Sequence, residues 1–321
     1  MRNICVCLEF LTEERCAAIR KTAESLGFSV RFFTLEQQAE ALAFAPDCEV
    51  LFAHDPELVR AAANLNWFHC AWAGVDAYCR DESLFANPAC LFTNNHSYGT
   101  TIAEHVILVT LMLLRRMPEY QSAMARKHWL SPLPIRSIRG SRFTLLGAGD
   151  ISRHVARRLR AMEAARVTAV SRSGRPQPDF DAVVPITKLD DILPETDVLI
   201  MALPGTAETA GILSRERMAL LPEGACVINV GRGAAMDQTA LCDALNTGHL
   251  GGAALDVMVP EPLPEDSPLW SAKNLILTPH VSGSTNLPYT CDLTVELFCR
   301  NLHRYAAGER LEGLVDRTSG Y

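Results

Sequence analysis

Two glycines stand between an apolar run and a helical stretch in the segment 145–152, which reads Leu-Leu-Gly-Ala-Gly-Asp-Ile-Ser. Gly147 permits the tight turn that follows a strand, and Gly149 lets the backbone approach a pyrophosphate. The helix expected over residues 151–162 would direct its N-terminal N–H groups at the phosphates. Ser152 replaces the third glycine of the usual pattern, at a position that governs helix–strand packing. Alone, this turn also fits a generic α/β domain.

Apolar runs and helical stretches alternate on both sides of this turn. The strands expected around and after it are residues 143–146, 167–170, 198–202, 227–230, 253–257 and 275–277. The strands expected earlier in the chain are residues 4–8, 29–33, 49–53, 67–71 and 90–93. Strands that alternate with helices form parallel sheets covered by helices on both faces. We therefore expect an α/β fold with two doubly wound parallel-sheet lobes, the second with six strands.

Three further segments organise these lobes. Residues 101–125 carry one long helical pattern, residues 129–140 form a Pro-containing connection, and residues 287–307 form a final helix. A chain of 321 residues suits two compact lobes, and we expect the final helix to return to the first one. The expected domains are a Rossmann dinucleotide-binding domain over 99–285, inserted in a flavodoxin-like substrate domain over 1–98 and 286–321.

Composition excludes several classes of protein. A net charge of -7 disfavours a nucleic-acid partner and binding to an anionic membrane. The most apolar run, residues 106–114, is about half the length that a bilayer span requires, and residues 4–10 are too short for a secretory segment. The 11 cysteines have no metal-ligand spacing. We expect no metal, buried cysteines such as Cys5, Cys70 and Cys226, and a reducing cytoplasm.

The end of the second strand of the dinucleotide lobe favours a particular cofactor. An acid that holds the adenine ribose usually stands about 20 residues after the glycines. Here the strand ends in Ser171, Arg172 and Ser173, followed by Arg175, with no carboxylate. Arginine binds phosphate in a bidentate manner. The sequence therefore predicts NADP(H) rather than NAD(H); the alternative is that the two arginines are solvated loop charges.

Three later strand ends deliver charged side chains. Arg232 stands between two glycines, Glu261 between two prolines, and His280 after a Thr-Pro pair. Ligands of open α/β sheets bind beyond the carboxyl ends of the strands, where all three residues are expected. Each alone also fits a loop charge, a turn residue or a structural histidine. Together, behind a dinucleotide turn, they predict a reaction centre.

These motifs resemble the D-isomer-specific 2-hydroxyacid dehydrogenase family, in particular its glyoxylate/hydroxypyruvate reductase-like members. The resemblance runs from about Gly74 to the end of the chain; the first seventy residues are similar only in pattern. The matching segments, in the family's order, are Ala73-Gly74-Val75-Asp76, the glycine turn, Leu203-Pro204, Asn229 to Gly233, Asp256 to Glu261 and Pro279-His280. The implied activity is hydride transfer between a nicotinamide and C2 of a 2-keto or 2-hydroxy acid.

The resemblance also implies roles for individual residues. Arg232 would bind the substrate carboxylate and polarise the carbonyl, and His280, paired with Glu261, would be the general acid in reduction and the base in oxidation. Formate-type relatives carry an amide where Glu261 stands. The implied cofactor-binding residues are Gly147, Gly149, Asp150, Ile151, Ser171, Arg172, Ser173, Leu203, Pro204, Val230, Gly231, Asp256, Ser282 and Gly283. The implied substrate-binding residues are Trp72, Ala73, Gly74, Val75, Arg232 and His280, with Asp256 on the nicotinamide carboxamide.

Elementary chemistry agrees with these roles. A ketone that receives hydride develops negative charge on oxygen, and therefore needs a proton donor and a fixed cation nearby. A carboxylate beside an imidazole favours the protonated ring. Position and bulk also suggest that His54 and Tyr289 line the substrate pocket, whereas His105, on an apolar helix, is expected to be structural.

Several alternatives remain open at this point. A non-catalytic dinucleotide-sensing scaffold could keep the same fold and the same three residues. A phosphoglycerate dehydrogenase is the nearer rival, although its longer forms add a regulatory domain after the final helix. Glyoxylate, hydroxypyruvate and bulkier 2-keto acids all fit as substrates. The helix over 101–125 is more apolar than one lobe requires, so we also expect a homodimer.

Overall fold

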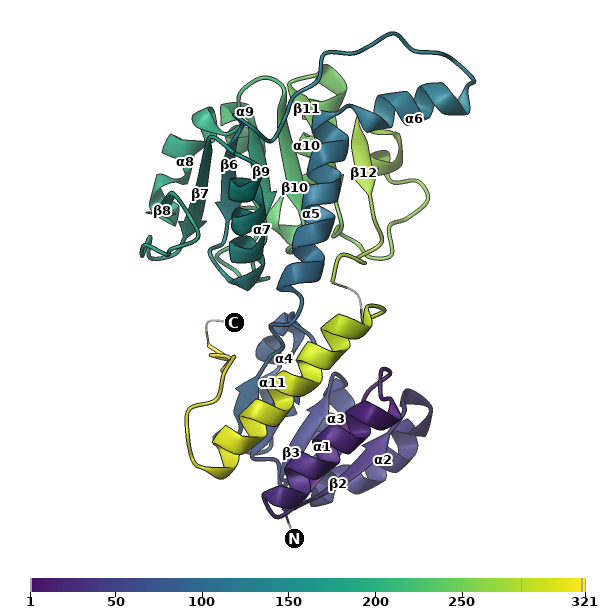
Figure 1. The fold of residues 1–321 in the computed structure, drawn as a ribbon, viewed down its shortest axis with the longest axis vertical. Helices are drawn as coiled ribbons and strands as arrows, with labels where there is room; N and C mark the ends of the chain where they lie inside the picture. Colours follow the sequence, from purple (N-terminus) through teal and green to yellow (C-terminus); the bar gives the residue numbers. More distant parts are fainter. Residues whose placement is uncertain (1, 284, 319, 321) are drawn as a thin grey trace. The chain divides into compact units, whose positions relative to one another are not determined.

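The computed structural model describes residues 2–283, 285–318 and 320. The chain forms two compact units, one of Met1–Tyr98 with Ser284–Tyr321 and one of Gly99–Gly283 (Figure 1). The first unit is thus discontinuous in sequence, and the second is inserted within it. In the described part of the chain, no helix has the length and apolar character needed to cross a bilayer.

The first unit contains a five-stranded parallel sheet. Its strands are β1 (Arg2–Cys7), β2 (Phe28–Phe33), β3 (Val50–Ala53), β4 (Trp67–Cys70) and β5 (Leu91–Thr93). They are ordered β2-β1-β3-β4-β5, and every pair is parallel. This is the flavodoxin-like order, in which the chain changes direction between β1 and β3. All five strands lie within two residues of the predicted ones.

Alternate residues of these strands build two cores, because side chains of a strand point to opposite faces. Ile4, Phe52 and Trp67 pack with α1 (Glu13–Ser25) and α11 (Pro288–Ala306). The opposite core, which includes Leu51 and Phe68, is covered by α2 (Gln38–Phe44), α3 (Pro56–Ala61) and α4 (Asp76–Arg80). The predicted final helix is confirmed as α11, which packs against α1 in the first unit (Figure 1).

The second unit contains a seven-stranded parallel sheet, ordered β12-β11-β10-β9-β6-β7-β8. Its strands are β6 (Arg142–Leu146), β7 (Arg166–Ser171), β8 (Ala182–Pro185), β9 (Val198–Met201), β10 (Ala225–Asn229), β11 (Leu250–Leu255) and β12 (Leu275–Leu277). The helices that contribute to the core of one face include α8 (Leu189–Ile192), α9 (Arg215–Leu220) and α10 (Gln238–Thr247). The helices α5 (Gly99–Leu114) and α7 (Asp150–Ala161) pack on each other in the same unit.

Two sequence predictions for this unit are wrong. The sheet has seven strands rather than six, because β8 was not predicted. All four of its residues are only partly buried, and it ends in Pro185, so its pattern is that of an edge strand rather than a core strand. The helix predicted over 101–125 is two helices, α5 and α6 (Met117–Ala125), because Arg116 adopts φ 58° between them.

Candidate active site

The glycine turn lies directly after β6. Gly147 has φ +102°, and its N–H donates to the carbonyl of Val170 at 2.8 Å. A Cβ at Gly147 would lie 2.9 Å from the Ala202 carbonyl oxygen, so this position requires glycine. At Gly149, the N-cap of α7, a Cβ would meet no atom within 4 Å. The start of α7 is therefore open to a diphosphate, which fits a dinucleotide.

The end of β7 has no acidic side chain. Ser171 Oγ accepts from the Gly174 N–H at 3.1 Å, and Ser173 Oγ accepts from the Arg175 N–H at 3.4 Å, so both hydroxyls shape the turn. Arg172 and Arg175 are exposed. Residues 171–175 therefore present two hydroxyls and two guanidinium groups and no carboxylate.

The next carboxylate along the chain, Asp179, forms ion pairs with two arginines. Its oxygens accept from Arg157 at 2.8 Å and from Arg153 at 2.6 Å. These hydrogen bonds lower the pKa of Asp179 to about 2. Asp179 is therefore engaged by two guanidinium groups of α7.

Glycines also fix the strand ends that follow. A Cβ at Gly231 would lie 2.7 Å from the backbone nitrogen of Leu203, and one at Gly233 would collide with the backbone of Met258. Asn229, which is fully buried, accepts from the Gly231 N–H at 3.0 Å and donates to the Arg232 carbonyl at 2.9 Å. The loop that carries Arg232 is thus held against the loops after β9 and β11. The roles of Asn229 and Gly233 were not predicted, although an asparagine before a glycine-rich strand end is a signal for such a loop.

Glu261 and His280 are in direct contact. The Nδ1 atom of His280 lies 2.8 Å from Glu261 Oε2, and Glu261 Oε1 accepts from the Met258 N–H at 2.9 Å. The carboxylate therefore fixes both the ring and its own loop. The side chain of His280 is 53% exposed, so the ring is accessible from solvent in this structure.

Asp256 holds the loop that carries His280. Its carboxylate, 1% exposed as a residue, accepts from Thr278 Oγ1 at 2.6 Å, from the Val281 N–H at 2.9 Å and from the Ser282 N–H at 3.0 Å. Burial acts to raise the pKa of Asp256, but hydrogen bonds that include those from Ser282 and Thr278 hold it below its usual value. Its carbonyl also accepts from the His280 N–H at 2.9 Å. The carboxamide contact implied for Asp256 stays a prediction.

The sheet brings the predicted residues of this unit to one edge. Asn229 pairs with Leu255, and Leu255 with Leu277, so Arg232, Asp256 and His280 follow the ends of neighbouring parallel strands. The turn after β6 and Leu203 after β9 lie at the same edge.

His105 contacts the loop that carries His280. Its Nε2 is 3.5 Å from Thr278 Oγ1, and burial lowers its pKa. This environment fits the predicted structural role.

The predicted substrate-binding turn belongs to the first unit. Asn95 donates from Nδ2 to the Ala71 carbonyl at 2.9 Å and from its backbone to that of Trp72 at 3.2 Å, and Asn94 Nδ2 donates to the Ala73 carbonyl at 2.7 Å. These bonds fix three successive carbonyls. Within the described part of the chain, the N–H groups at 74 and 75 have no hydrogen-bond partner, which suits a carboxylate ligand.

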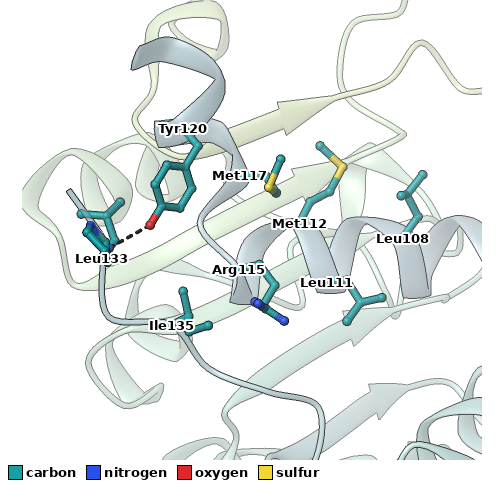
Figure 2. A pocket seen from close by; sticks show the side chains of 9 residues that line it. Leu108, Leu111, Met112, Arg115, Met117, Tyr120, Leu133 and Ile135 are labelled. Atoms are coloured by element: carbon teal, nitrogen blue, oxygen red, sulfur yellow. Dashed lines mark hydrogen bonds between the residues drawn. The ribbon is translucent and has the colours of Figure 1, made fainter. Parts of the chain in front are cut away.

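A separate apolar pocket of about 440 Å³ lies between α5, α6 and the connection after them. Figure 2 shows the side chains that line it, among them Leu108, Met112 and Ile135, with the hydroxyl of Tyr120 accepting from the Leu133 N–H at 2.8 Å. None of the residues described as lining it belongs to the predicted catalytic or cofactor set. The pocket is therefore distinct from the edge of the sheet where those residues gather.

The chain is similar to proteins of one known family. Residues 107–282 match the model of the "D-isomer specific 2-hydroxyacid dehydrogenase, NAD binding domain". The chain is 32% identical over 286 residues to glyoxylate/hydroxypyruvate reductase A of Salmonella paratyphi B, covering 88% of this chain and 87% of that protein.

Solved structures extend the similarity to the whole chain. A D-isomer specific 2-hydroxyacid dehydrogenase family protein from Aeromonas salmonicida is 32% identical with a TM-score of 0.81, covering 98% of this chain and 99% of the other. The NADPH-dependent glyoxylate/hydroxypyruvate reductase of Sinorhizobium meliloti, in complex with NADP and sulfate, is 27% identical with a TM-score of 0.84 and full coverage of both chains. The chain therefore belongs to the D-isomer specific 2-hydroxyacid dehydrogenase family, whose members are NAD(P)-dependent oxidoreductases of 2-hydroxy acids.

Proposed function

We propose that this protein reduces a small 2-keto acid with NADPH, with His280 as the acid/base, Glu261 as its partner and Arg232 as the group that binds the substrate carboxylate. The observation that carries the proposal is the 2.8 Å contact between His280 Nδ1 and Glu261 Oε2, at the sheet edge that also carries the glycine turn. The nicotinamide, when bound, supplies the hydride. The Gly147–Gly149 turn and the start of α7 would hold its diphosphate.

The proposed proton transfer follows from the contact between these two side chains. Glu261 accepts the Nδ1 proton of His280, which orients the ring and leaves Nε2–H for the substrate. In reduction, Nε2 gives its proton to the carbonyl oxygen as C2 receives hydride, and solvent restores the proton. Arg232 stabilises the charge that develops on that oxygen. Gly74 and Val75 are proposed to add backbone N–H donors to the substrate carboxylate.

A turnover assay separates this proposal from its rivals. Purified protein is mixed with NADPH and a panel that contains glyoxylate, hydroxypyruvate, pyruvate, phenylpyruvate and 3-phosphohydroxypyruvate, and loss of nicotinamide absorbance is followed. Reduction of the unphosphorylated acids supports the proposal. Tight NADPH binding without any turnover would support the sensing scaffold, and selective use of the phosphorylated acid would support the phosphoglycerate dehydrogenase.

The cofactor preference is a separate prediction. We expect kcat/KM with NADPH to exceed that with NADH by about tenfold or more, because the end of β7 offers guanidinium groups and no carboxylate. The Sinorhizobium meliloti relative was solved with NADP. Arg172→Ala should reduce the NADPH/NADH ratio of kcat/KM by about tenfold. Arg166→Ala, at the other end of β7, is the matched control; a wild-type preference for NADH would refute the prediction.

We also propose a homodimer that forms through α5, α6 and the connection after them. In Figure 1, α6 and the connection after it project from the body of the second unit, whereas α5 packs on that body. Leu108 of α5, Met124 of α6 and Trp129 of the connection are 55%, 73% and 97% exposed. Exposed apolar side chains that form one patch mark protein interfaces, and we propose that these three residues belong to such a patch. Light scattering should give twice the chain mass for the wild type and a monomer for Leu108→Glu, while Leu35→Glu stays dimeric. A monomeric wild type at micromolar concentration would contradict the proposal.

A further inference from the structure

The strand order of the first unit predicts a ligand-binding site at the carboxyl ends of its strands. Its strand order β2-β1-β3-β4-β5 changes direction between β1 and β3, and open parallel sheets bind ligands at that point, beyond the carboxyl ends of the strands. Three side chains follow neighbouring strands there: Glu9 after β1, His54 after β3 and Trp72 after β4. We call these three residues the Glu9–His54–Trp72 cluster.

The members of the cluster contact one another in series. His54 Nδ1 lies 3.5 Å from Glu9 Oε2, and the imidazole stacks on the Trp72 indole with centroids 4.3 Å apart and planes at 15°. The backbone of His54 is also fixed, because its carbonyl accepts from the Tyr78 hydroxyl at 2.5 Å. The side chain of His54 is only 13% exposed, whereas that of Glu9 is 33% exposed. The imidazole therefore covers one face of the indole and restricts its movement.

Trp72 offers a flat apolar surface beside the carboxylate-binding turn. One face of the indole is covered by His54, yet 45% of the residue is exposed. The carbonyl of Trp72 is held by Asn95, so the side chain projects from a fixed backbone. The N–H groups at 74 and 75 follow within three residues. A ligand whose carboxylate binds at those N–H groups can therefore reach the indole with a neighbouring substituent.

We infer that Trp72 determines substrate specificity, selecting 2-keto acids with a planar aromatic substituent on C3, the phenylpyruvate class. This inference rests on the proposed function. An aromatic ring on C3 can pack against the open face of the indole, a contact that aromatic pairs favour beyond simple burial. Glyoxylate has no C3 and cannot make it. His54 is a positioning residue, since its imidazole is the ring on which Trp72 stacks, and the Glu9 carboxylate approaches that imidazole at 3.5 Å without a hydrogen bond.

Substrate ratios test the inference. We measure kcat/KM for phenylpyruvate and for glyoxylate with NADPH, and expect the wild type to favour phenylpyruvate by about tenfold or more. Trp72→Ala should lower that ratio by about tenfold or more, Trp72→Phe should restore most of it, and His54→Ala should raise KM for phenylpyruvate more than for glyoxylate. Trp270→Ala, an exposed tryptophan of the other unit, is the matched control. A wild type that prefers glyoxylate, or a ratio that Trp72→Ala leaves unchanged, overturns the inference.

A binding measurement separates this inference from the proposed function. If the wild type reduces none of the acids, the proposed function fails, and calorimetric titration of the NADPH-loaded protein with phenyllactate then decides the role of Trp72. Binding that weakens about tenfold or more in Trp72→Ala, with recovery in Trp72→Phe, supports the aromatic site. Absent binding, or equal affinity in all three proteins, overturns it.

Discussion

Replacing His280 with alanine should lower kcat for 2-keto acid reduction by about 10²-fold or more and leave the Kd for NADPH nearly unchanged. The variant removes the proton donor, while the glycine turn after β6 and the start of α7 stay intact. Steady-state kinetics give kcat, and quenching of protein fluorescence gives Kd. His303→Ala, an exposed histidine on α11, is the matched control and should leave both quantities unchanged.

Glu261→Gln tests whether the negative charge of Glu261 matters, because glutamine has nearly the same size and shape. Glutamine can still accept from the Met258 N–H, but its second position presents an amide to His280 in place of the Oε2 that lies 2.8 Å away. A smaller loss in kcat than for His280→Ala is expected, because the imidazole remains as proton donor but loses the carboxylate that accepts its Nδ1–H and orients the ring. If NADPH affinity fell by as large a factor as kcat in either variant, the site would be misfolded or wrongly assigned.

The strands were largely predictable because both faces of a parallel sheet are buried. Runs such as β9, all four residues of which are buried, are apolar throughout and stand out from the polar segments around them. β8 did not stand out, since an edge strand covered on fewer sides needs no such run. The break at Arg116 was missed although it has a local signal: Pro118 stands in the first turn of α6, and a proline inside a helical pattern ends or kinks the helix just before it.

The candidate site also has features that the sequence predicts and features that only the fold reveals. Gly147 and Gly149 were predictable because their backbone roles are local to one turn. The contact of Gly233 with Met258 was not, since it depends on which strands are neighbours in the folded sheet. Likewise, the hydrogen bonds that hold Asp256 to the His280 loop join residues separated by more than twenty positions. Sequence motifs identify the charged residues. The residues that hold them in place depend on which strands are neighbours in the sheet.

Arg232→Gln should lower kcat/KM for 2-keto acids by about 10²–10³-fold, through both a higher KM and a lower kcat. The reason is that one guanidinium is proposed to bind the substrate carboxylate in the ground state and to stabilise charge on the carbonyl oxygen in the transition state. His280→Ala, by contrast, should act on kcat alone. The two variants therefore have different kinetic signatures, although both residues lie at the same edge of the sheet.

Arg232→Lys sharpens the test of that residue. Lysine keeps the positive charge but cannot bind a carboxylate with two parallel hydrogen bonds, so it should recover part of kcat while KM stays high. Arg215→Gln, which removes an exposed guanidinium paired with Asp243 on the same unit, is the matched control and should keep wild-type kinetics. If Arg232→Gln changed kcat without raising KM, Arg232 would not bind the carboxylate, and that role would pass to the N–H groups of Gly74 and Val75.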